Sequence, residues 1–106
     1  MEKKQKVFEK IIRDYLISKK SLVLIEEGYG DLLDSENTKD YERNVKFIKK
    51  NVEITLQMMD QDARSILENE FILKQEPFWW MDRYSKSTFY RYRSQAIERF
   101  IEFYQR

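Results

Sequence analysis

The chain has 106 residues, of which 42% are hydrophobic, 15% aromatic and 37% charged, with a formal net charge of +1. This length supports one domain with one modest core, and the apolar content excludes a wholly disordered chain. Cysteine and histidine are both absent. Their absence excludes disulfides, thiolate zinc sites and histidine-based acid–base catalysis. We therefore expect no metal site, no cofactor and no enzymatic activity.

The scarcity of helix-breaking residues predicts an all-α fold. Only two glycines and one proline occur among many Lys, Glu, Arg and Gln residues. We expect about five helices: two long N-terminal helices within residues 1–59, and a helix-turn-helix within residues 60–106 of the same domain. The charged start, Met1–Lys6, lacks the apolar run of a signal peptide, and no segment approaches the roughly 20 apolar residues of a membrane span. We expect a cytoplasmic protein without a membrane partner.

The first predicted helix covers roughly Lys3–Glu27. Apolar residues recur in it at three-to-four spacing, which is typical of an amphipathic helix. They are Val7, Phe8, Ile11, Ile12, Tyr15, Leu16, Leu22 and Val23. Gly28 provides a left-handed stop, and the polar segment Tyr29–Asn37 is expected to form a loop.

The second predicted helix starts at a cap formed by Asn37 or Thr38, with Asp40 in its first turn. Its apolar residues form a heptad-like seam about five turns long. They are Tyr41, Val45, Ile48, Val52, Leu56 and Met59. This seam predicts an antiparallel pair of long helices within one chain, or, as an alternative, a homodimer contact.

The last third of the chain divides into three shorter helices. Asp60 or Asp62 starts the first, whose inward residues are Ala63, Ile66, Leu67 and Phe71. After a break at 74–77, Pro77 suits the first position of a short helix over Phe78–Arg83. Ser85 caps the last helix, which runs to about Tyr104. Its expected buried stripe is Phe89, Tyr92, Ala96, Ile97, Phe100 and Tyr104.

Charge is distributed unevenly around this last helix. Residues 51–77 contain six acids and two bases, whereas residues 83–93 contain four bases and no acid. A short helix, a turn and a Ser-capped basic helix are the parts of a helix-turn-helix, whose second helix enters the major groove of double-stranded DNA. The residues expected to contact DNA are Arg83, Ser85, Lys86, Ser87, Thr88, Tyr90, Arg91 and Ser94.

The same segment resembles the C-terminal end of phage ArpU-type late transcriptional regulators and, more distantly, region 4 of sigma factors. The resemblance is carried by Ser85, Phe89, Tyr92, Ala96-Ile97 and Phe100, with Asp62–Leu67 similar to the preceding helix, and covers about the last 45 residues. It implies transcriptional control of phage or prophage genes. Arg83 replaces the glycine often found in the turn, and Asp82 replaces an apolar residue.

Trp79 and Trp80 are adjacent, so on a helix their side chains point about 100° apart. One of them is expected to anchor the core while the other lies half-exposed. The alternative is that both form a docking surface for a second subunit or RNA polymerase, which would make the chain a protein-interaction module.

Overall fold

The computed structural model describes residues 2–28 and 38–104. Within these residues it contains four α-helices, one π-helical turn and no strand. The elements are α1 (Glu2–Glu26), α2 (Thr38–Met58), α3 (Gln61–Leu67), η2 (Glu68–Ile72) and α4 (Lys86–Tyr104). The expected all-α fold with two long N-terminal helices is confirmed. Asn37 and the loop expected over Tyr29–Asn37 lie outside the described residues.

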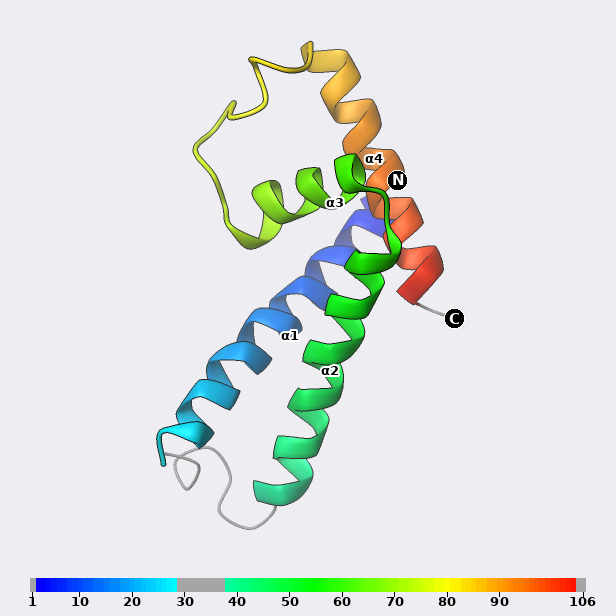
Figure 1. Ribbon diagram of the computed structural model, residues 1–106. Coiled ribbons are helices and arrows are strands. Elements are labelled where there is room, and N and C mark those ends of the chain that lie inside the picture. The colour runs from blue at the N-terminus through cyan, green and yellow to red at the C-terminus, as the bar shows by residue number, and fades with distance from the viewer. Residues whose placement is uncertain (1, 29–37, 105–106) are drawn as a thin grey trace.

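Helices α1 and α2 form the antiparallel pair predicted within one chain (Figure 1). The predicted seam is confirmed for Val45, Val52 and Leu56 of α2 and for Met59 directly after it, which are buried, whereas Tyr41 and Ile48 are half-buried. On α1 the prediction is confirmed for Phe8, Ile12, Tyr15 and Leu22 and is wrong for Val7 and Val23, which are exposed. Helix α1 ends at Glu26, one residue before the predicted Glu27, and Gly28 follows with a φ of 90° in the left-handed region, as expected of a stop.

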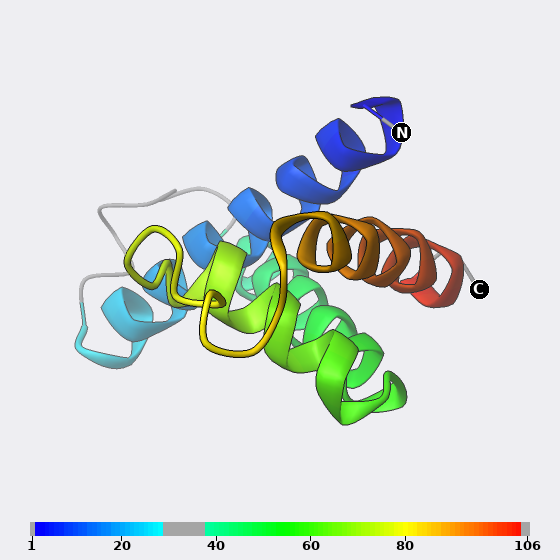
Figure 2. The same ribbon diagram turned by 90° about the horizontal axis from the view of Figure 1, so that it is seen from above.

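One core joins this pair to the C-terminal half. Figure 2 shows α4 lying over the end of the pair that carries the N-terminus. Ala96, Ile97, Phe100 and Ile101 of α4 are buried against α1 and α2. The Phe8 ring makes edge contacts with two aromatic rings at the centre of this core: those of Phe71 (4.9 Å between centroids) and Phe100 (5.1 Å).

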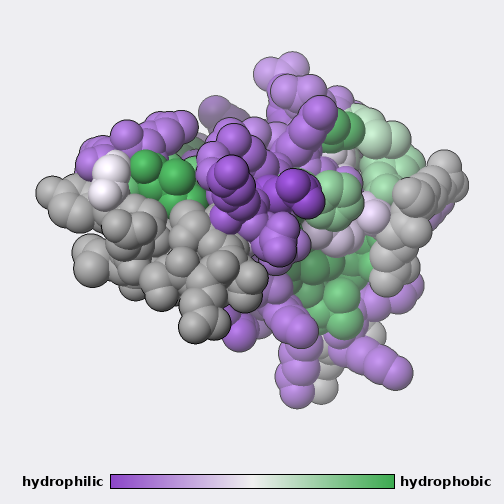
Figure 3. Space-filling view, turned by 90° about the horizontal axis from the view of Figure 1, so that it is seen from below, coloured by the Kyte–Doolittle hydropathy of each residue, from purple (hydrophilic) through white to green (hydrophobic). Residues whose placement is uncertain are grey.

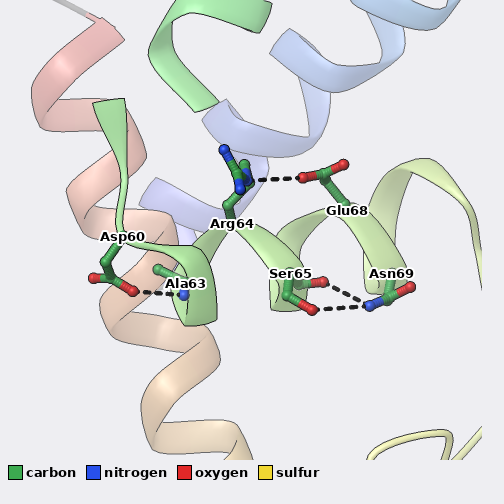
Figure 4. A network of polar contacts seen from close by, with 6 residues as sticks. All are labelled: Asp60, Ala63, Arg64, Ser65, Glu68 and Asn69. Atoms are coloured by element: carbon green, nitrogen blue, oxygen red, sulfur yellow. Dashed lines mark hydrogen bonds and ion pairs between the residues drawn. The ribbon is translucent and has the colours of Figure 1, made fainter. Parts of the chain in front are cut away.

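Helix α3 starts at the predicted Asp60 cap, whose carboxylate accepts a hydrogen bond from the Ala63 backbone N–H at 2.8 Å (Figure 4). Arg64 pairs with Glu68, and the Asn69 amide donates to the Ser65 carbonyl, so local side chains support this short helix. It continues directly into the π-helical turn η2, and the inward positions Ile66 and Leu67 are buried as expected.

The short helix predicted over Phe78–Arg83 does not form. In its place, overlapping turns are closed by hydrogen bonds from the Trp79, Met81 and Arg83 N–H groups to carbonyls three residues earlier. Phe78 has a positive φ of 65°, which interrupts the helical path. Residues 73–85 therefore connect η2 to α4 as an irregular segment instead of the tight turn of a standard helix-turn-helix.

Hydrophobic patches on the surface of the molecule are separated by hydrophilic side chains (Figure 3). The exposed large apolar residues of the long helices are Val7, Ile17, Val23, Phe47, Ile54 and Met58. Among the described residues, no helix is both long and apolar enough to cross a membrane.

Candidate nucleic-acid interface

The predicted cap of the last helix is confirmed. Ser85 Oγ accepts a hydrogen bond from the Thr88 backbone N–H at 3.3 Å and donates one to Thr88 Oγ1 at 2.9 Å. The other N–H groups of the first turn have no partner within the helix, and the helix dipole makes this end partially positive. The N-terminus of α4 is therefore suited to an anionic partner such as phosphate.

Most of the residues expected to contact DNA are exposed to solvent. Arg83, Lys86, Ser87, Tyr90 and Arg91 are exposed, whereas Thr88 and Ser94 are half-buried. Figure 1 shows the first turns of α4 at the end of the molecule opposite the turn that follows α1. The structure thus brings most of the predicted set together on one protruding helix end.

A small aromatic cluster fixes this helix end against α3. Its buried members are Ile66, Trp80 and Phe89, and Trp79 and Tyr84 pack around them. The Trp80 and Phe89 rings are stacked, with centroids 4.5 Å apart and planes 7° from parallel. Trp80 belongs to the irregular segment 73–85 and Ile66 belongs to α3. The cluster therefore supports α4 in the place of the short helix that does not form.

Tyr92 does not lie in the buried stripe. Its side chain is 39% exposed and makes an edge contact with the Tyr84 ring, 5.7 Å between centroids. The first turns of α4 extend beyond the helical pair, so only the Phe89 side of this end is covered. The other expected positions, Ala96, Ile97 and Phe100, are buried. Tyr104 is half-buried.

As expected, one tryptophan lies in the core and the other is partly exposed: Trp80 is 5% exposed, and Trp79 is half-buried. The Trp80 indole is stacked inside the aromatic cluster and so presents little surface to a docking partner. Trp79 donates from Nε1 to Glu70 Oε1 at 3.0 Å. The exposed apolar residues next to the tryptophans are Phe78 (61%) and Met81 (64%), beside Lys86 in a shallow groove.

Sequence reasoning missed the position of Arg93, which it counted with the other bases of the segment. The Arg93 side chain is only 17% exposed, and its Nε lies 3.4 Å from Glu70 Oε2. Its position four residues from the buried Phe89, on the packed side of the helix, was the available signal. Of the four bases in residues 83–93, three are exposed and one is paired internally.

Comparison with known proteins adds no relative to this picture: no protein family, curated protein or solved structure matches the chain. The functional argument is therefore carried by the start of α4. This helix end combines exposed bases, hydroxyl groups, open backbone N–H groups and a rigid aromatic support.

Proposed function

We propose that this chain is a transcriptional regulator that binds double-stranded DNA, with α4 as its recognition helix. The observation that carries the proposal is the acid-free start of α4, where Lys86, Ser87, Tyr90 and Arg91 are exposed. Arg and Lys side chains contact phosphates and guanine edges, and hydroxyls contact phosphates or bases. The resemblance to ArpU-type regulators supports the same function.

The arrangement suits a duplex better than a single strand. A major groove about 12 Å wide admits one α-helix, and the first turns of α4 lie at one end of the molecule (Figure 1). Single-strand binding needs several free aromatic rings for stacking bases. Here Phe89 is buried, and the two exposed rings of this helix end, Tyr90 and Tyr92, each pack edge-on against another aromatic ring.

The proposal is tested by selecting bound duplexes from a random pool. We expect one enriched sequence, bound with strong salt dependence, and a palindromic sequence would support the homodimer alternative. On the enriched site, Arg91→Ala should cost about 1–3 kcal/mol. Arg99→Ala is the matched control, because Arg99 is also exposed but lies eight residues further along α4. Failure to enrich any sequence, without binding at low salt, would contradict the proposal.

A second candidate function is docking of a protein such as RNA polymerase. The observation that favours it is the exposure of Phe78 and Met81, since large exposed apolar side chains are typical of interaction surfaces. Binding to polymerase that survives high salt and is lost in Phe78→Ser would support this function. Phe47→Ser is the control, because Phe47 is equally exposed on α2.

A further inference from the structure

Glu70 contacts two segments that are distant from it in the sequence. Its Oε1 accepts the Trp79 Nε1–H hydrogen bond at 3.0 Å, and its Oε2 lies 3.4 Å from Arg93 Nε. Glu70 belongs to η2, Trp79 to the turn segment and Arg93 to α4. One carboxylate, itself only 24% exposed, therefore joins the three parts of the C-terminal half.

The Arg93 guanidinium contacts aromatic rings as well as the Glu70 carboxylate. Its guanidinium carbon lies 5.0 Å from the centroid of the Phe71 ring and 5.7 Å from that of the Tyr90 ring. The Nε atom is buried and makes no hydrogen bond to any of the described residues, so its contact with Glu70 is an ion pair without hydrogen-bond geometry. A mostly buried guanidinium held in this way depends on Glu70 to compensate its charge.

This ion pair lowers the charge that α4 presents to a ligand. Arg83, Lys86 and Arg91 are exposed, whereas the Arg93 guanidinium is paired with the Glu70 carboxylate. A further free cation here would attract phosphates of any sequence, because phosphate contacts carry affinity without reading bases. Because Glu70 neutralises Arg93, a larger share of the binding free energy comes from the side chains that contact bases.

We infer that Glu70 is a specificity-determining and positioning residue, which withholds Arg93 from DNA phosphates and fixes the Trp79 turn against α4. The inference rests on the proposed function. Glu70 does not itself touch DNA, and it acts through Arg93 and Trp79.

The test is Glu70→Gln, which keeps a carbonyl acceptor for Trp79 Nε1 but carries no charge. We expect tighter binding to unrelated duplexes and a salt dependence steeper by up to about 0.9 in log–log slope, the value for one added phosphate contact. The ratio of affinities for the selected and unrelated duplexes should fall. Glu68→Gln is the matched control, since Glu68 lies on the same π-helical turn but pairs with Arg64 of α3.

The double variant Glu70→Gln/Arg93→Gln isolates the part played by Arg93. It removes both charges together and should return the salt slope to the wild-type value, even if Glu70→Gln alone does not fold. A slope below that of the wild type would show that Arg93 contacts phosphate, and would overturn the inference. So would a Glu70→Gln protein that binds all duplexes more weakly with an unchanged slope. A wild-type protein that binds no duplex at low salt would instead refute the proposed function.

Discussion

The indole of Trp80 lies flat against the ring of Phe89, with their centroids 4.5 Å apart. This contact connects the irregular turn segment to the first turns of α4, where the exposed bases lie. Both rings are almost fully buried. This aromatic stack therefore helps to hold the start of the proposed recognition helix, in the place of the short helix expected over Phe78–Arg83.

Trp80→Ala should destabilise the protein by about 3–5 kcal/mol, because it removes a buried aromatic side chain and leaves a cavity beside Phe89 and Ile66. Urea unfolding followed by circular dichroism measures this loss. The control Phe78→Ala truncates an exposed ring two residues earlier and should change stability by no more than about 0.5 kcal/mol. Equal losses in the two variants would contradict the assigned roles.

Ser85→Ala should cost about 1 kcal/mol, because it removes the acceptor for the Thr88 backbone N–H at the start of α4. Ser85→Asp should retain most of the stability, since a carboxylate caps the same N–H and suits the helix dipole. The matched control is Ser87→Ala, an exposed hydroxyl in the same turn. Thermal unfolding of the three variants provides the comparison.

Stability should fall in alkaline solution because of Tyr15. Burial, followed by its hydrogen bond to Glu53 at 2.9 Å, raises the pKa of Tyr15 from 10.0 to about 12. The folded state holds this proton more tightly, so the stabilisation is complete below pH 10 and is lost as the pH rises through 12. The loss is on the order of 2 kcal/mol.

Urea unfolding between pH 8 and pH 11.5 checks this expectation, with Tyr15→Phe as the comparison. The variant loses the hydrogen bond to Glu53, so it should be less stable at pH 8 but should change less with pH. Burial also raises the pKa of Tyr104, so a smaller alkaline loss persists in the variant. Identical pH profiles for both proteins would rule out Tyr15 as the source.

The long helices could be predicted from the sequence because their seams are local and regular. Phe8, Ile12, Val52 and Leu56 recur at helical spacing, and each is buried. Val7 was misplaced because it directly precedes the buried Phe8 and so points about 100° away from it, at the edge of the apolar arc. Periodicity gives the centre of such an arc, and only the position of the neighbouring helix decides where it ends.

The candidate site was less predictable, because long-range contacts shape it. The sequence around Pro77 favours a short helix, but the stacking of Trp80 on Phe89 and the positive φ of Phe78 accompany a series of turns. The pairing of Arg93 with Glu70 joins residues 23 positions apart through a π-helical turn. The spacing of residues along one helix cannot predict an ion pair between residues so distant in the sequence.

The central claim is tested most directly by the affinity of the protein for a labelled duplex carrying the selected sequence, measured by fluorescence anisotropy over a salt titration. The variant Lys86→Ala/Arg91→Ala removes two exposed bases from the start of α4, and Lys20→Ala/Arg43→Ala removes two exposed bases from the opposite end of the long-helix pair. We expect the first variant to bind at least tenfold more weakly with a shallower salt slope, and the second to bind as the wild type does. Equal affinities for all three proteins, or no binding by the wild type at low salt, would contradict the proposal that α4 is a DNA recognition helix.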